Sequence, residues 1–366
     1  MALRVVVKIG TSSVARGTNG INIKAIEKLA EEVSNAQKKG HEILVVTSGA
    51  IAVGLNPLGM SGQRPKDLLT LQAVSAVGQT ILMNAYNDSL SSFGLVGGQV
   101  LLAPFDFWDR KQYLHARRTL LRLLELKVIP VINENDAIAD DEIRFGDNDR
   151  LAALVAHLVN ADLLVLLTDT PGVFSSDPRI DPNASLIQEV ESSEREISAV
   201  LGGPGTEGGS GGMVSKLAAA RMAAWSGVAS LIAAANRPDV LTDAISGSPG
   251  TGTFVHPHRH KMSARKLWIA FAVSSKGCVV VDNGAKSALV KSGRSLLPAG
   301  IVSVSGNFEQ DEAIEIMSSD QKIFAKGLAR LSSQQLNKWK GFHTSDLPGD
   351  ISHEVVHRDD LVILDS

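Results

Sequence analysis

The chain has 366 residues, of which 44% are hydrophobic and 20% are charged, and its formal net charge is -3. These values are typical of a folded globular protein and exclude a strongly basic nucleic-acid-binding or membrane-surface protein. Cys278 is the only cysteine, which excludes an intrachain disulfide. With neither a signal-peptide pattern nor an apolar run of membrane length, we expect a cytoplasmic protein without a membrane contact.

The first part of the chain alternates between predicted strands and predicted helices. Residues 3–9 are a short β-branched run ended by a glycine, which is typical of a strand. A helix is predicted over 22–39, where Asn22 can cap the start and Gly40 can end the last turn. The other predicted strands are 41–49, 95–102, 128–136, 162–169 and 228–235, and the other predicted helices are 68–90, 114–126, 150–159 and 212–225. This order predicts an α/β fold, a three-layer αβα sandwich with a mainly parallel sheet.

The pattern changes near residue 255, where a basic, histidine-rich stretch follows. The later strands are short and separated by turn residues, at 277–284, 300–306, 312–318 and 323–329. This spacing predicts a small, mostly-β second domain. We therefore expect a first domain at 1–257, a linker at 258–273, the β domain at 274–352 and a C-terminal segment at 353–366.

Polar clusters stand at the ends of successive predicted strands. They are Lys8–Ser13, Thr47–Ala50, Asn133–Asp136 with Gly146–Arg150, Thr168–Asp169 and the glycine-rich Gly209–Lys216. One such cluster alone would be an ordinary turn or helix cap. Five of them favour a ligand site, because ligands of open α/β sheets bind beyond the carboxyl ends of the strands. Glycine-rich backbone before a helix also offers N–H groups to a phosphate.

The residue types in these clusters favour phosphoryl transfer. Lys8 and Lys216 supply positive charge, and such a reaction depends mainly on positioning and charge stabilisation. No histidine or cysteine stands where a general base is needed. A carboxylate acceptor needs none, because with a pKa of about 4.3 it is already ionised at neutral pH.

Two motifs that suggest other chemistry do not fit their surroundings. "HEVVH", residues 353–357, matches a zinc-protease pattern, but its setting "EVVHRDDLVIL", residues 354–364, reads as a strand. Two histidines four apart on a strand, such as His353 and His357, would lie about 13 Å apart. "GPGTEG", residues 203–208, matches a dinucleotide-binding pattern without the strand that must precede it. We therefore assign no metal-ligating residue.

The chain resembles the glutamate 5-kinase family of the amino acid kinase superfamily, whose members carry a C-terminal PUA domain. The resemblance rests on "VVKIGTSSV", "VVTSGAIAVG", "AVGQ", "PVINENDAI", "FGDNDRLAA", "LLTDTPGVFSSDPR", "GSGGMVSK" and "VDNGAKSALVKSGRSLLPAGIVSVSGNF". It implies synthesis of L-glutamate 5-phosphate from L-glutamate and ATP with Mg²⁺, the first step of proline biosynthesis. It also implies a homo-oligomer, dimer or tetramer, and feedback inhibition by proline.

The resemblance also implies a role for each motif residue. Lys8 and Lys216 would hold the transferring phosphoryl group, and Asp149 would orient both lysines. Glutamate would be bound by Ser48, Gly49, Asn133, Asp136, Asp147 and Asn148. ATP would be bound by Lys8, Gly10, Thr168, Asp169, Ser210, Gly211, Gly212, Met213, Val214, Ser215 and Lys216. From the residues alone, Asp149 could instead be a carboxylate at a helix N-terminus, and Asp169 a turn cap.

Other functions stay open at this point. One is a different carboxylate kinase of the same superfamily, acting on acetylglutamate or aspartate. Another is RNA binding through the PUA domain, but residues 274–366 hold ten Lys/Arg and twelve Asp/Glu, without the basic footprint that RNA binding needs. In that domain "FEQDEAIEI" lacks the glycine that the family has between two strands, which leaves the turn geometry open.

Overall fold

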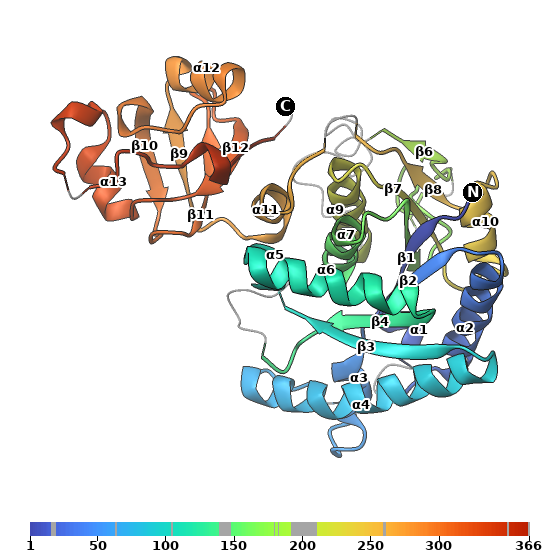
Figure 1. Ribbon diagram of the computed structural model, residues 1–366. Helices are drawn as coiled ribbons and strands as arrows, with labels where there is room; N and C mark the ends of the chain where they lie inside the picture. Colours follow the sequence, from blue (N-terminus) through green and yellow to red (C-terminus); the bar gives the residue numbers. More distant parts are fainter. Residues whose placement is uncertain are drawn as a thin grey trace. The chain divides into compact units, whose positions relative to one another are not determined.

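The computed structural model describes residues 1–15, 20–62, 64–103, 105–138, 148–178, 180–181, 183–191, 211–258, 261–349 and 351–364. The chain divides into two compact units, Met1–Ala264 and Arg265–Ser366 (Figure 1). The narrower domain bounds expected from the sequence stay predictions.

The first unit is built on an eight-stranded sheet in the order β3-β4-β2-β1-β5-β7-β8-β6. All neighbouring strands are parallel except β7 and β8, which are antiparallel. The strands are β1 (Arg4–Ile9), β2 (Glu42–Val46), β3 (Val96–Leu102), β4 (Val128–Glu134), β5 (Leu163–Thr168), β6 (Glu189–Val190), β7 (Ala229–Ala234) and β8 (Thr253–Val255). The predicted mainly parallel sheet is confirmed.

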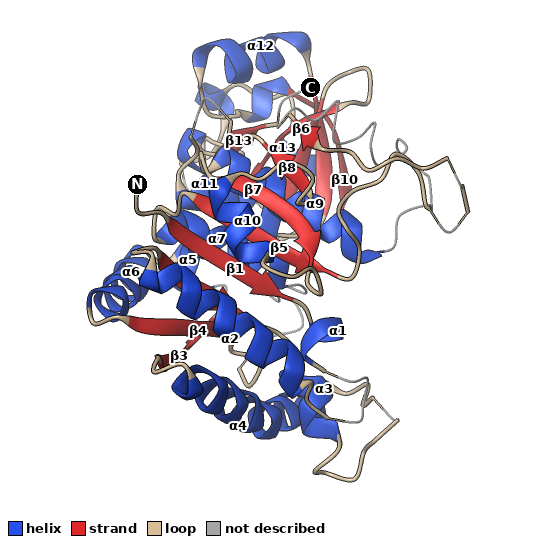
Figure 2. Ribbon diagram, turned by 90° about the vertical axis from the view of Figure 1, so that its right-hand side faces the viewer, coloured by secondary structure: helices blue, strands red, loops and turns tan. Residues whose placement is uncertain are grey.

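Helices cover both faces of this sheet (Figures 1 and 2). The described helices are α1 (Thr11–Val14), α2 (Ile23–Lys38), α3 (Ala50–Leu55), α4 (Leu68–Ser92), α5 (Phe105–Trp108), α6 (Arg110–Glu125), α7 (Asn148–Leu158), α9 (Gly211–Trp225) and α10 (Val240–Ser246). Helices α2, α4 and α10 share one hydrophobic core with the sheet. Helices α6, α7 and α9 pack against β4, β1 and β7 respectively. The predicted three-layer αβα sandwich is therefore confirmed.

The alternation of side chains along β1 decides where its lysine lies. Val5, Val7 and Ile9 belong to the core beneath α2 and α4. Successive residues of a strand face opposite sides, so Val6 and Lys8 face the layer that contains α7. Lys8 is thus placed on the α7 side of the central strand.

Two helices start two or more residues earlier than the sequence predicts. Helix α6 begins at Arg110 rather than 114, because the Asp109 carboxylate accepts a hydrogen bond from the Gln112 N–H at 2.8 Å and caps the first turn. Helix α7 begins at Asn148 rather than 150. The first unit also has α1, α3, α5 and α10, which were not predicted.

Helices α3 and α4 touch backbone to backbone through two glycines. A Cβ on Gly54 would lie 2.1 Å from the Val74 carbonyl oxygen, and a Cβ on Gly78 would lie 1.8 Å from the Ala50 carbonyl oxygen. This close crossing fixes α3 against α4. Because α3 begins directly after Gly49, the crossing also positions the turn that follows β2.

Helix α4 is long and apolar enough to cross a membrane by length and composition, with 44% of its most apolar window buried. Length and composition alone are weak evidence for a membrane span, because the core helix of a folded domain can have both. Leu82, Met83, Tyr86 and Leu90 of α4 lie in the core under the sheet. We therefore interpret α4 as a core helix.

The second unit holds a separate five-stranded sheet in the order β10-β9-β11-β12-β13. Its strands are β9 (Gly277–Val281), β10 (Ile301–Gly306), β11 (Ala313–Met317), β12 (Ile323–Leu328) and β13 (Leu361–Ile363). Helices α12 (Asn283–Ser292) and α13 (Ser333–Trp339) accompany it, and α11 (Ala264–Leu267) with a π-helical turn (Trp268–Ala272) precedes it in the chain. The prediction that the second part of the chain is mostly β is confirmed.

The turn between β10 and β11 forms without the expected glycine. Asp311 takes the left-handed conformation there, with φ of 67°, and its N–H donates to the Ala329 carbonyl at 2.7 Å. Aspartate is one of the few residues with a side chain that adopt this conformation readily.

The reading of residues 354–364 as one strand was wrong. The segment forms a 3-10 turn over Arg358–Asp360 before the short strand β13. The reason is the buried Asp360 carboxylate, which pairs with Arg265 at 2.5 Å and with Arg330 at 2.8 Å.

The Gly78 contact yields a stability prediction. In Gly78→Ala the new methyl group meets fixed backbone, at a cost that exceeds the gain of about 1 kcal/mol in helix propensity. We expect the free energy of unfolding to fall by about 1–3 kcal/mol, measured by urea denaturation. Thr80→Ala on the exposed side of α4 should stay within about 0.5 kcal/mol of the parent. Equal stability of the Gly78→Ala and parent proteins would contradict the contact.

His157 at the end of α7 yields a pH prediction. Burial, with the nearby charges of Lys261 and Arg117, lowers its pKa to about 4 from 6.5. Between pH 6.5 and 4 the unfolded chain therefore takes up a proton that the folded chain does not, and stability falls as the pH is lowered. The loss is at most about 3 kcal/mol. In His157→Gln, urea unfolding measured across this range should show a weaker pH dependence; an unchanged slope would refute the assignment.

Candidate active site

The centre of the candidate site is a buried carboxylate held between two lysines. Asp149 Oδ1 lies 2.5 Å from Lys8 Nζ, and Asp149 Oδ2 lies 3.1 Å from Lys216 Nζ. The exposed fractions of the three side chains are 4% for Lys8, 1% for Asp149 and 10% for Lys216. The three groups, called the ion triad below, therefore interact almost without water between them.

The elements that carry the ion triad explain why it forms. Lys8 comes from the middle strand β1, Asp149 from the first turn of α7, and Lys216 from the second turn of α9. Helix α7 packs against both β1 and α9. A carboxylate at the start of α7 therefore lies between the two lysines, and the helix dipole favours its charge.

The charges of the triad determine the protonation of its carboxylate. Burial by itself raises the pKa of Asp149, but the charges of Lys8 and Lys216 outweigh burial and hold that pKa below its usual value. Asp149 is therefore ionised at neutral pH, and the triad keeps one positive charge in excess. Such an excess in a desolvated place favours an anionic ligand.

A second group of side chains forms a chain of amides beside the triad. Asn148 Nδ2 donates to the Thr47 carbonyl and, at 2.6 Å, to Asn133 Oδ1. Asn133 Nδ2 donates at 2.8 Å to Gln79 Oε1 on α4. Asn148 directly precedes Asp149, so this chain joins the triad to β4 and α4.

The predicted glutamate-binding residues Ser48 and Gly49 lie in the turn between β2 and α3. Ser48 Oγ accepts a hydrogen bond from Thr11 Oγ1 at 3.1 Å. Gly49 has φ of 99° and precedes the first residue of α3. A side chain there would be strained, so the turn requires glycine. The hydrogen bond between Thr11 and Ser48 connects the loop after β1 with the turn after β2.

Other predicted residues lie around these groups. Gly10 follows β1, and an ideal Cβ built on it would lie 3.6 Å from Lys8 Nζ, so its backbone adjoins the lysine ammonium. Asp136 Oδ2 accepts a hydrogen bond from Ser75 Oγ at 3.0 Å. Ser215 Oγ lies 3.1 Å from Asp149 Oδ2, which draws the start of α9 to the triad. Gly211, Gly212, Met213 and Val214 belong to the same first turns of α9.

Two predicted residues fall outside the described part of the chain. They are Asp147, expected to bind glutamate, and Ser210, expected to bind ATP.

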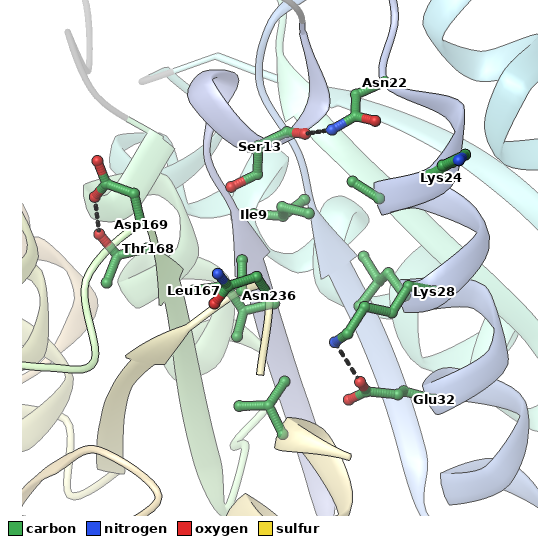
Figure 3. Close-up of a pocket in the computed structure, with 14 residues that line it drawn as sticks. Ile9, Ser13, Asn22, Lys24, Lys28, Glu32, Leu167, Thr168, Asp169 and Asn236 are labelled. Carbon is green, nitrogen blue, oxygen red and sulfur yellow. Dashed lines mark hydrogen bonds and ion pairs between the residues drawn. The ribbon is translucent and has the colours of Figure 1, made fainter. Parts of the chain in front are cut away.

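Thr168 and Asp169 border a cavity of about 370 Å³ at the carboxyl end of β5 (Figure 3). Thr168 Oγ1 donates to Asp169 Oδ1 at 3.0 Å. Apolar side chains and a polar rim line the cavity, among them Ile9, Leu29, Leu167, Ser13, Asn22, Lys24 and Asn236. Lys28 in its wall is paired with Glu32 at 2.5 Å. Such a lining suits a small organic molecule with polar edges.

Sequence reasoning gave no role in the site to Ser75, Gln79 and Tyr86, and it named Thr47 only as part of a polar cluster. Tyr86 OH donates to Thr47 Oγ1 at 2.9 Å, and burial raises the pKa of Tyr86, so the phenol stays protonated. A signal for two of them existed: Ser75 and Gln79 are polar residues four positions apart in an apolar helix, and so lie on one face.

Comparisons with known proteins identify the family of the chain. The pattern of the amino acid kinase family matches residues 3–233, and that of the PUA domain matches residues 277–348. The chain is 42% identical to the glutamate 5-kinase of Caldanaerobacter subterraneus over 99% of this chain and 98% of that protein. It is 45% identical to the glutamate 5-kinase of Nocardia farcinica over 99% of this chain and 97% of that protein.

A solved structure shows the same fold. The carbamate kinase from Giardia lamblia, bound to AMP-PNP, superposes with a TM-score of 0.53 over 70% of this chain and 99% of that chain, at 18% identity. The family match covers more than half of the chain, and the similarity to curated relatives covers nearly all of it. The chain therefore belongs to the amino acid kinase family and, within it, to the glutamate 5-kinases.

Proposed function

We propose that the protein transfers the γ-phosphoryl group of ATP to the side-chain carboxylate of L-glutamate, with the ion triad as its charge-stabilising centre. The observation that carries the proposal is the pair of lysines held by one carboxylate. Lys8 and Lys216 stabilise the charge on the transferring phosphoryl group, and Asp149 fixes the position of both ammonium groups. Catalysis of this kind rests on positioned charge rather than on a protein nucleophile.

The acceptor needs no general base from the protein. The γ-carboxylate of glutamate is ionised at neutral pH, since its pKa lies near about 4.3. The obstacle is the repulsion between this carboxylate and the phosphates of ATP. The excess positive charge of the triad and the N–H groups around Gly10 and Gly49 counter that repulsion.

Substrates are divided between two groups of residues in this proposal. Ser48, Gly49, Asn133, Asp136, Asp147 and Asn148 bind glutamate, and Gly10, Thr168, Asp169 and the segment 210–216 bind ATP. The hydrogen bonds from Thr11 to Ser48 and from Ser215 to Asp149 support this division. The first ties the Ser48 turn to the loop after Lys8, and the second ties the start of α9 to the triad.

Magnesium is part of the proposal. Among the residues that the structure describes, no three His, Cys, Asp or Glu side chains gather as a metal cluster. Both carboxylate oxygens of Asp149 are already ion-paired with lysines. The donors present therefore fit an ion carried mainly by phosphate oxygens and water, as Mg²⁺ commonly is, and the ion would supply further charge neutralisation.

We also propose a cytoplasmic homo-oligomer inhibited by proline, and a structural or regulatory role for the PUA domain. The family assignment supports the first part, and the acidic balance of residues 274–366 supports the second over RNA binding.

Trapping with hydroxylamine tests the reaction. An acyl phosphate formed from glutamate is converted to a hydroxamate, and its formation should require ATP and Mg²⁺ and fall when proline is added. Product from N-acetylglutamate or aspartate, with none from glutamate, would move the protein to another carboxylate kinase of the family. Testing glutamate, N-acetylglutamate and aspartate in parallel therefore shows which of them is the phosphoryl acceptor.

Lys8→Ala tests the role of the triad. The variant keeps the neutral pair Asp149–Lys216, so it should fold with nearly the parent stability. Its turnover should fall about a thousandfold or more, measured by ADP release at saturating substrates. The exposed Lys39→Ala is the control and should retain the parent rate. Full activity of Lys8→Ala, or loss of its cooperative urea unfolding, would contradict the assigned role.

A further inference from the structure

Helix α4 sends two buried polar side chains to the glutamate side of the site. Ser75 and Gln79 are 3% and 8% exposed and lie on one face of the helix, four residues apart. Ser75 Oγ donates to Asp136 Oδ2 at 3.0 Å, and Gln79 Oε1 accepts from Asn133 Nδ2 at 2.8 Å. Helix α4 therefore hydrogen-bonds two side chains at the carboxyl end of β4, Asp136 and Asn133.

Backbone groups fix which way the Asn133 amide faces. The Glu134 N–H, which can only donate, points to Asn133 Oδ1 at 2.9 Å. The other end of the amide, Nδ2, is therefore the donor that reaches Gln79 Oε1. Gln79 supplies the acceptor that this orientation needs.

The orientation is passed on to Asn148. Its Nδ2 donates both to the Thr47 carbonyl, which can only accept, and to Asn133 Oδ1. Both N–H groups of that amide are then used. A reversed amide would set Asn148 Oδ1 against two acceptor oxygens, so the direction is determined.

The acceptor end of Asn148 remains for a ligand. Within the described part of the chain, Asn148 Oδ1 accepts no hydrogen bond, although the residue is 8% exposed. A carbonyl oxygen pairs only with a donor. L-Glutamate carries two carboxylates, which accept, and one ammonium group, which donates.

We propose that Gln79 and Ser75 are positioning residues that aim two acceptors, Asn148 Oδ1 and the Asp136 carboxylate, at the α-ammonium group of the substrate. Gln79 acts through Asn133, and Ser75 acts directly on Asp136. The inference rests on the proposed function and adds which group of glutamate these residues recognise. The specificity for an amino acid over a plain dicarboxylate then depends on helix α4.

Gln79→Met tests the longer path. The thioether has nearly the size of the amide but offers Asn133 Nδ2 no comparable acceptor, so the KM for glutamate should rise about tenfold. The KM for ATP should stay within about twofold. Gln79→Glu keeps an acceptor oxygen and should restore most of the glutamate affinity. Gln99→Met is the matched control, because within the described residues the Gln99 side chain contacts Gln79 at its Nε2 end, which donates to Gln99 Oε1 at 3.3 Å. Its KM values should match the parent.

Glutarate separates ammonium recognition from general damage to the site. It has the carbon chain and both carboxylates of glutamate without the ammonium group. Its inhibition constant against glutamate should be the same in the parent and in Gln79→Met, while the glutamate KM rises. A parallel loss for both molecules, or an unchanged glutamate KM in a folded variant, would overturn the proposal.

Ser75→Ala provides a second, smaller change if Gln79→Met does not fold. It should raise the glutamate KM several-fold and leave the glutarate inhibition constant and the ATP KM unchanged. An unchanged glutamate KM in Ser75→Ala would overturn the proposal for Asp136. Failure of the proposed function would appear differently, as absence of hydroxamate from glutamate in the parent protein.

Discussion

The ion pairing of one carboxylate with two lysines is the constraint on which the site depends. Lys8 and Lys216 are more than two hundred residues apart in sequence, and both are almost entirely buried. A buried ammonium group without a partner costs several kcal/mol, and Asp149 supplies a charged partner that both lysines share. The packing of α7 between β1 and α9 supplies this partner, and the strand order of the sheet brings the surrounding loops to it.

The same pairing connects stability with chemistry. Full compensation of the two lysines would need a second carboxylate, which would repel both ATP and the glutamate carboxylate. Within the triad, one carboxylate holds both lysines in place, and the three groups together carry one net positive charge. This net positive charge destabilises the unliganded site, and the binding of anions offsets that cost. The offset is largest in the transition state of phosphoryl transfer, where charge is redistributed.

The sequence was informative where chemistry is local and less so where it depends on distant contacts. Lys8, Asp149 and Lys216 stand in short motifs beside strand ends, and the structure brings all three together. The spacing of Ser75 and Gln79 places both on one face of an apolar helix, but their partners Asp136 and Asn133 are 61 and 54 positions away, so only the packing of α4 shows what they bind. Asp360 shows the opposite effect, because its pairing with two arginines breaks a segment whose apolar residues indicate a strand.

The chain of buried amides, Gln79, Asn133 and Asn148, indicates why the site is polar beside the triad. An apolar set of side chains at Gln79, Asn133 and Asn148 would avoid the cost of about 1–3 kcal/mol that each amide incurs if a hydrogen bond is lost. An amide chain is useful if its direction matters, since an amide distinguishes a donor from an acceptor and a hydrocarbon does not. Here the direction is anchored by the Thr47 carbonyl and the Glu134 N–H, backbone groups that remain when a side chain is exchanged for any other than proline. Side-chain changes can break the chain but cannot reverse it, so the preference for a donor at Asn148 is a property of the fold itself.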